Sequence, residues 1–208
     1  MSLKCGIVGL PNVGKSTLFN ALTATQAAQA ANYPFCTIEP NVGRVAVPDP
    51  RLDKLAAIAT SAKIVNTQLD FVDIAGLVKG ASKGEGLGNK FLANIREVEA
   101  IVFGLRAFED DDVPGPSDPL EHLRVVEIEL ALADLETVET RMSRAQKAAR
   151  MDKSLGDEMG ALERAHVHLS EGRPLYRAGL SKDDLELLAP HFLLTAREVL
   201  AVVNVAED

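Results

Sequence analysis

The sequence predicts an α/β fold in which helices flank a mostly parallel β-sheet and an antiparallel helical hairpin is inserted. Three patterns carry this prediction. Short apolar runs alternate with helical periodicity along the chain, as happens where crossover helices join parallel strands. A loop containing two glycines follows the first apolar run directly. The stretch between the last two apolar runs has the heptad-like spacing of paired helices.

Five apolar runs are the expected strands. The fourth is apolar enough to be buried on both faces of a parallel sheet. A helical pattern from Lys15 to about Ala24 follows the first strand. After the second strand, an amphipathic helix is marked by Leu52, Leu55, Ala56 and Ile58. The expected strands are Cys5–Leu10, Val42–Val47, Leu69–Ala75, Ala100–Phe108 and Val199–Val205.

The inserted hairpin follows an acidic, proline-rich linker, Asp110–Pro119. Apolar residues then step by three and four, and a turn near residues 152–156 separates two such stripes. The hairpin either packs on the domain or projects toward a partner. Ser181 to Asp184 resembles the capping box of a further helix. We expect a first part at 1–118, the insertion at 119–190 and a return to the sheet at 191–208. The stripes are Ile128, Ala131, Leu135, Val138, Met142, Ala145 and Ala149, then Leu155, Met159, Leu162 and Leu169.

Length and composition are those of a globular domain with an insertion. The chain has 208 residues, of which 47% are hydrophobic and 25% charged. A net charge of −8 argues against DNA as a partner, because phosphate contacts need clustered Lys and Arg. No run reaches the roughly 18 apolar residues of a membrane span, so we expect a cytoplasmic protein without a membrane partner. Cys5 and Cys36 lack metal-site spacing and are expected to be reduced thiols.

The loop after the first strand, Gly9–Ser16, matches the phosphate-binding pattern G-x-x-x-x-G-K-[ST]. Its glycines let successive N–H groups point at an anion, and the helix that follows adds the positive end of its dipole. We expect Lys15 to bridge the β- and γ-phosphates and Ser16 to ligate Mg²⁺. The sequence therefore predicts a P-loop nucleoside triphosphatase. Its nucleotide contacts are expected at Asn12, Val13, Gly14, Lys15, Ser16 and Thr17.

A second acidic group for the metal is expected at the end of the third strand. Asp73 is placed to act on Mg²⁺ through a water. Gly76 follows, where an unhindered N–H can meet the γ-phosphate, so Gly76 and Lys15 are the expected catalytic residues. Residues 77–88 include four glycines. They favour a switch that the γ-phosphate orders, with a passive flexible loop as the alternative.

Four stretches together resemble the YchF, or Obg-like ATPase, family, and the resemblance extends over essentially the whole chain. It implies that Thr37 is the switch threonine, which ligates Mg²⁺ and senses the γ-phosphate. It also implies association with the ribosome, chiefly with the large subunit. The stretches are Gly9–Leu22, Ala31–Asn41, Asp73–Val78 and Gly80–Leu92.

The residues at the end of the fifth strand predict which nucleotide base the site prefers. Many GTPases read guanine with Asn-Lys-x-Asp, whereas this chain has Asn204-Val-Ala-Glu. Val205 replaces the lysine stem that packs on the base, and the longer Glu207 does not fit the same reach. Asn204 can still pair with N6 and N7 of adenine. These residues favour ATP over GTP, as in the resembling family.

Turnover is expected to be slow. Many GTPases place a glutamine after the switch glycine to orient the attacking water, and Leu77 cannot do this. A K⁺ ion held by Asn12, which resembles the asparagine of potassium-activated relatives, would supply positive charge; alternatively, Asn12 only shapes the loop. One hairpin helix is locally basic, either as a solvated face or as a contact for rRNA or tRNA. Its basic residues are Arg141, Arg144, Lys147 and Arg150.

Two features depart from the resembling family. Family members often carry a histidine after the fourth strand, where this chain has DVPGP at 112–116. The chain also stops before the expected last helix-strand unit and the family's C-terminal TGS domain, so we expect a fragment. The leading hypothesis is an ATP-hydrolysing switch that acts on ribosomes. The alternatives are a GTPase of the Obg class and a nucleotide-gated binding module whose hydrolysis is incidental.

Overall fold

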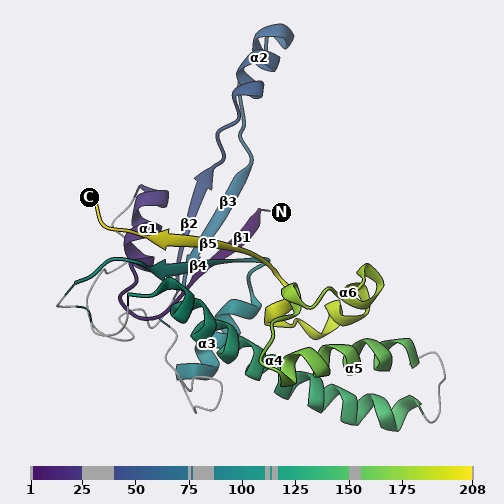
Figure 1. Ribbon diagram of the computed structural model, residues 1–208. Coiled ribbons are helices and arrows are strands. Elements are labelled where there is room, and N and C mark those ends of the chain that lie inside the picture. The colour runs from purple at the N-terminus through teal and green to yellow at the C-terminus, as the bar shows by residue number, and fades with distance from the viewer. Residues whose placement is uncertain are drawn as a thin grey trace.

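The structure of the chain is a computed structural model that describes residues 2–24, 40–74, 76, 87–110, 113, 117–149 and 156–207, without side-chain detail at 87–90 and 147–149. Its centre is a five-stranded sheet of order β2-β3-β1-β4-β5 (Figure 1). The strands are β1 (Leu3–Val8), β2 (Asn41–Ala46), β3 (Gln68–Asp73), β4 (Ala100–Arg106) and β5 (Glu198–Asn204). All five predicted strands are confirmed, with ends displaced by up to two residues.

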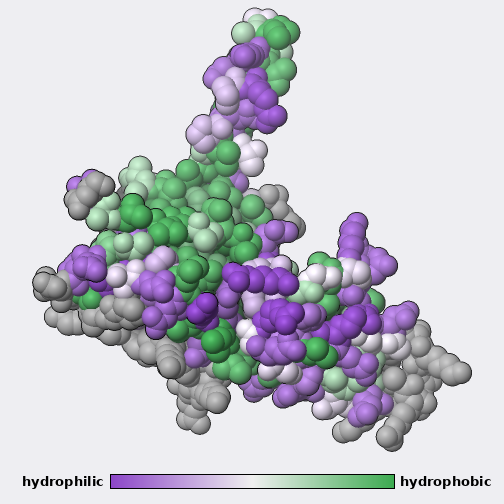
Figure 2. Space-filling model, in the orientation of Figure 1, coloured by the Kyte–Doolittle hydropathy of each residue, from purple (hydrophilic) through white to green (hydrophobic). Residues whose placement is uncertain are grey.

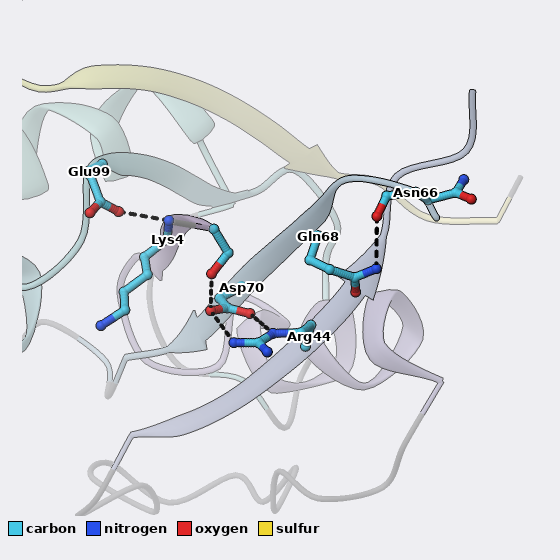
Figure 3. Close-up of polar contacts among 7 residues, drawn as sticks. Lys4, Arg44, Asn66, Gln68, Asp70 and Glu99 are labelled. Carbon is cyan, nitrogen blue, oxygen red and sulfur yellow. Dashed lines mark hydrogen bonds and ion pairs between the residues drawn. The ribbon is translucent and has the colours of Figure 1, made fainter. Parts of the chain in front are cut away.

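The sheet is mostly parallel, as predicted. β1 pairs in parallel with β3 and β4, and β4 pairs in parallel with β5. β2 is the exception, because it returns antiparallel to β3. Within this pair Arg44 lies opposite Asp70, whose carboxylate also accepts a 2.6 Å hydrogen bond from the hydroxyl of Ser2, the residue before β1. Figure 3 shows the Arg44 guanidinium directed at the Asp70 carboxylate, with Nε 2.7 Å from Oδ1. These partners lower the pKa of Asp70 to about 2.

The connection between β2 and β3 carries α2 (Pro50–Ala59) well beyond the sheet (Figure 1). The predicted helix is present and begins at Pro50, because the Asp49 side chain accepts from the Arg51 N–H and Pro50 occupies the first turn. Its apolar stripe, however, does not pack on the described residues, since no α2 residue is buried and Ile58 is 82% exposed. The amphipathic pattern therefore predicts the helix correctly but not a buried face.

Alternating side chains of the central strands face two separate cores. Cys5 and Ile7 of β1 pack with Phe19 of α1 (Lys15–Thr23) on one face. On the other face, Ile101 and Phe103 of β4 pack against α3 (Leu87–Arg96) and the first half of α4 (Pro119–Ala149). β4 is thus buried on both faces, as predicted.

The outer strands carry exposed apolar side chains. Val42, Leu200 and Val203 are examples, and Figure 2 shows an apolar area over the strands beside a more hydrophilic helical region. Cys5, in contrast, is a free and buried cysteine whose thiol pKa is raised by that burial. Among the described residues, no helix is both long and apolar enough to cross a bilayer.

The second half of α4 pairs with α5 (Gly156–Ser170) to form the hairpin that the heptad-like pattern predicts. Buried residues of both stripes meet in one cluster, among them Ala131 and Val138 of α4 and Leu162 and Leu169 of α5. Ile128 is an exception at 47% exposure. The cluster continues into α6 (Lys182–Leu188), which begins with the predicted capping box. Three short 3₁₀ helices complete this region: η3 (Leu175–Arg177), η4 (Ala189–His191) and η5 (Leu194–Ala196).

Asp134 fixes α4 to the segment that leads into β5. Its buried carboxylate accepts from the Leu194 N–H at 2.8 Å, and from the Thr195 N–H and hydroxyl at 2.7 Å each. Burial raises the pKa of Asp134, while these hydrogen bonds oppose the rise. Arg197 adds a second tie by donating to the carbonyl oxygen of Arg96 at the end of α3. The start of β5 is therefore held by both α3 and α4.

Candidate nucleotide-binding site

The loop between β1 and α1 lies against the end of β4. A Cβ at Gly9 would sit 2.4 Å from the carbonyl oxygen of Gly104, a distance that only glycine avoids. Asn12 and Gly14 both have positive φ, 59° and 93° respectively. This backbone turns the loop back into α1, whose first hydrogen bonds include Leu18 N–H to the Gly14 carbonyl at 2.9 Å. The glycine requirements read from the motif thus have specific steric causes.

Lys15 is buried within this loop, with 7% of the residue exposed. Its ammonium donates to the carbonyl oxygen of Leu10 at 2.8 Å, so the loop backbone holds the charge near its own N–H groups. An ammonium in this position has hydrogen-bonding capacity for an anion, because Lys carries three donors.

Ser16 and Asp73 meet at the other side of the loop. The Ser16 hydroxyl donates to Asp73 Oδ2 at 2.8 Å, although 57 residues separate them in sequence. Asp73 Oδ1 is buried and has no hydrogen-bond partner among the described residues. Burial raises the pKa of Asp73, and the Ser16 hydrogen bond and the Lys15 charge oppose that rise.

This pair fits a Mg²⁺ ion. A hydroxyl and a carboxylate supply the hard oxygens that Mg²⁺ prefers, and the unpartnered Oδ1 is a further acceptor for the ion or its water. The described residues contain no group of three or more His, Cys, Asp or Glu side chains able to hold a metal alone. Such a minimal protein contribution is usual where phosphate oxygens complete the coordination. Thr37, the third expected ligand, lies outside the described residues.

Gly76 lies against the same loop. A Cβ there would be 3.0 Å from both the backbone nitrogen and Cα of Pro11, so glycine permits this approach. The expected γ-phosphate contact is therefore adjacent to the loop, although Leu77 and residues 78–86 lie outside the described residues.

A cavity of about 210 Å³ lies between this loop, α1 and the end of β5. The side-chain amide of Asn204 donates to the Val13 carbonyl at 3.2 Å, and the backbone carbonyl of Asn204 accepts from the Ala107 N–H at 2.8 Å. Val205 and Glu207 are exposed beyond the strand and do not line the cavity. The lining residues are Val13, Gly14, Lys15, Thr17, Leu18, Ala21, Gly104, Val202, Val203 and Asn204.

Sequence reasoning predicted half of this lining and missed Leu18, Ala21, Gly104, Val202 and Val203. α1 periodicity would have placed the first two on one helical face. The other three depend on the pairing of β4 with β5, in which Gly104 lies opposite Val202. No short motif encodes that register.

A strand that runs into a lysine-enclosing loop, with a serine set against an aspartate from the neighbouring strand, defines the mixed α/β fold of P-loop GTPases. The comparisons with known proteins support the assignment to this fold. The family profile described as "50S ribosome-binding GTPase" matches residues 4–149. The chain belongs to this 50S ribosome-binding GTPase family, and the curated relatives that align with the full chain include YchF proteins.

Three relatives illustrate the similarity. The chain is 52% identical to the ribosome-binding ATPase YchF of Haemophilus influenzae and 50% identical to that of Bacillus subtilis, in each case over 100% of this chain and 58% of the relative. The solved structure of the Schizosaccharomyces pombe YchF GTPase superposes with a TM-score of 0.78 at 39% identity, covering 99% of this chain and 57% of that one. The chain thus spans less than two thirds of the length of these relatives.

Proposed function

We propose that this chain forms the nucleotide-binding part of a Mg²⁺-dependent nucleoside triphosphatase that prefers ATP to GTP. The observation that carries the proposal is the 2.8 Å contact between Ser16 and Asp73 beside the enclosed Lys15 ammonium. Lys15 neutralises the β- and γ-phosphates, and Ser16, Thr37 and Asp73 hold the metal. Gly76 offers its N–H to the γ-phosphate.

The preference for ATP rests on Asn204. Its amide nitrogen donates to the P-loop, which leaves the side-chain oxygen and a second N–H for the base. An adenine amino group is a donor that this oxygen can accept. The names of the relatives differ on this point, since two are called ATPases and the solved structure a GTPase. A direct competition between ATP and GTP therefore decides the base.

We propose further that hydrolysis switches association with the large ribosomal subunit in the cytoplasm. The names "50S ribosome-binding GTPase" and "Ribosome-binding ATPase" support this partner. Leu77, which cannot orient the attacking water, suits a slow enzyme whose turnover the partner controls. K⁺ beside Asn12 is the proposed activating ion.

The test is equilibrium binding of fluorescent ATP and GTP analogues with and without Mg²⁺. Lys15→Ala is expected to abolish measurable uptake of both, while Lys54→Ala, on the exposed α2, leaves it unchanged. Retention of both nucleotides by Lys15→Ala refutes the phosphate site. Tighter binding of GTP than ATP refutes only the base preference, and single-turnover hydrolysis that is equal in K⁺ and Na⁺ refutes the activating ion.

A further inference from the structure

Arg106 is the last residue of β4, and among the described residues it is the one buried arginine, with 3% of the residue exposed. Burial of a charged group is unfavourable unless hydrogen bonds replace the lost water. No carboxylate of the described residues forms an ion pair with Arg106. Other groups therefore stabilise the buried guanidinium.

Three backbone carbonyls and an aromatic ring surround this guanidinium. Nε donates to the carbonyl oxygen of Phe108 at 2.8 Å, and Nη1 donates to that of Val113 at 2.9 Å. Nη2 lies 3.4 Å from the carbonyl oxygen of Asp110. The guanidinium carbon also lies 4.9 Å from the centre of the Phe108 ring, a cation–π distance. All of these groups belong to the turn that follows β4, so Arg106 holds that turn in one conformation.

The turn that Arg106 holds is joined to the end of β5. Arg106 pairs in register with Asn204, and the N–H of Ala107 donates to the backbone carbonyl of Asn204 at 2.8 Å. Ala107 lies between Arg106 and its carbonyl partner Phe108, so the direction of the Ala107 N–H depends on how Arg106 holds the turn. The side chain of Asn204 then donates to the Val13 carbonyl of the phosphate loop at 3.2 Å. Consecutive hydrogen bonds thus connect the buried guanidinium to the phosphate loop.

Strand alternation places Arg106 on the face of the sheet that carries the phosphate loop. Leu105 packs in the core beneath α3 and α4, so its two neighbours in β4 point to the opposite face. One of them, Gly104, lies beside the loop, since a Cβ there would be 3.4 Å from Cγ of Lys15. Arg106 itself does not line the cavity of about 210 Å³, and each of its guanidinium nitrogens already faces a carbonyl. Arg106 can therefore influence a bound nucleotide through its neighbours but not by direct contact.

We infer that Arg106 is a positioning residue for the base of the bound nucleotide. By holding the turn after β4, it fixes the Ala107 N–H, and this N–H fixes the end of β5 so that the Asn204 side chain is directed at the phosphate loop and the base. The inference rests on the proposed function, because the contact of Asn204 with the base is part of it. Lysine cannot replace Arg106 in this role, because a single ammonium lacks the planar fork that addresses separate carbonyls.

The test compares ATP with inorganic tripolyphosphate, which carries the phosphates without the base. Isothermal titration calorimetry of the intact chain with Mg²⁺ measures both affinities. Arg106→Lys is expected to weaken ATP binding by about fivefold, the effect of losing one hydrogen bond between neutral groups. Tripolyphosphate binding is expected to stay unchanged, because the phosphate loop is intact. A residue that only supports the fold would affect both ligands, so equal losses for the two, or no loss for ATP, overturn the inference.

The matched control is Arg124→Lys, the same substitution at an exposed arginine of α4, which is expected to leave both affinities unchanged. The route through Asn204 is tested in an Asn204→Ala chain. Arg106→Lys is expected to cause no further loss of ATP affinity in that chain. A further loss of about fivefold there would contradict a role that acts through Asn204.

Phe108→Ala provides a second variant for the case in which circular dichroism shows that Arg106→Lys does not fold. It removes the ring beside the guanidinium and leaves the three carbonyls in place. We expect a smaller loss of ATP affinity than for Arg106→Lys, again with unchanged tripolyphosphate binding. Unchanged ATP binding by Phe108→Ala then overturns the inference.

Amide hydrogen exchange, read by NMR on the chain without nucleotide, separates this inference from the proposed function. In Arg106→Lys the Ala107 amide is expected to exchange about fivefold faster, whereas the Val102 amide, inside β4, keeps its rate. An unaltered rate at Ala107 overturns the inference. If the unaltered chain binds neither ATP nor tripolyphosphate, the proposed function is wrong, while the exchange rates still decide whether Arg106 holds Ala107 against Asn204.

Discussion

Substituting Gly14 with alanine tests the link between the phosphate loop and strand β5. Gly14 has φ of 93°, and a Cβ there would lie 2.6 Å from Nδ2 of Asn204. Two costs follow. The left-handed backbone costs an L-residue about 1–2 kcal/mol. In addition, Asn204 must move off the Val13 carbonyl, which loses a hydrogen bond worth about 1 kcal/mol.

The two costs separate in a double-mutant cycle. In the unaltered background, Gly14→Ala is expected to lower the free energy of unfolding by about 2–3 kcal/mol, which is the sum of both effects. In the Asn204→Ala background, the hydrogen bond is already absent and the Cβ meets no amide. Only the backbone cost of about 1–2 kcal/mol remains there. The expected coupling between the two sites is therefore about 1 kcal/mol.

Urea unfolding followed by circular dichroism measures these differences, since the chain has no tryptophan for fluorescence. Unchanged m-values are needed, so that each midpoint shift reports stability. The reasoning fails if Gly14→Ala has the same cost in both backgrounds to within about 0.3 kcal/mol. Such additivity would mean that the Asn204 amide and the loop are independent.

Three further predictions concern buried or paired carboxylates. Asp73→Asn is expected to weaken nucleotide binding in the presence of Mg²⁺ by about tenfold or more, while binding without Mg²⁺ changes little. Titration of a fluorescent nucleotide analogue with and without Mg²⁺ measures both affinities. An equal loss in both conditions would contradict a metal role for Asp73. The pKa of Asp70 is lowered from 3.8 to about 2, so its stabilising effect is complete above pH 3.8 and is lost as pH falls toward 2. Acid unfolding of the chain should therefore be less steep for Arg44→Met, and identical pH profiles would contradict this pairing. Asp134→Ala leaves three buried donors, two of them on Thr195, without an acceptor, and we expect a loss of about 3 kcal/mol or more in unfolding free energy; a loss under about 1 kcal/mol would contradict the buried geometry.

The elements that depend on residues close together in the sequence were predicted correctly. The phosphate loop, the capping box that opens α6 and the helical hairpin follow from spacing within a few residues. Asp73 was found because a P-loop needs an acidic group at a strand end. The 2.8 Å contact between Ser16 and Asp73 confirms that the two residues meet. Thr37 was chosen by resemblance alone and stays a prediction.

The remainder depends on partners far apart in sequence. Nothing in β2 indicates that it returns antiparallel, because strand periodicity is the same in either direction. The apolar stripe of α2 marks a helix but does not identify a face that covers it. The contact between Gly9 and Gly104 depends on the register of β1 with β4. The hydrogen bond between the Asn204 side chain and the Val13 carbonyl likewise depends on β5 lying beside β4.

Strands β4 and β5 are neighbours in the sheet, yet the whole segment from residue 107 to residue 197 intervenes. Bringing the ends of so long an unstructured segment together would cost loop-closure entropy that grows with the logarithm of its length. The hairpin of α4 and α5 lowers this entropy cost, because its helices form from local contacts and bring the chain back to the sheet beside β4. We expect β5 to dock late in folding, after the hairpin, so that the last strand to join the sheet is the one that completes the cavity beside the phosphate loop.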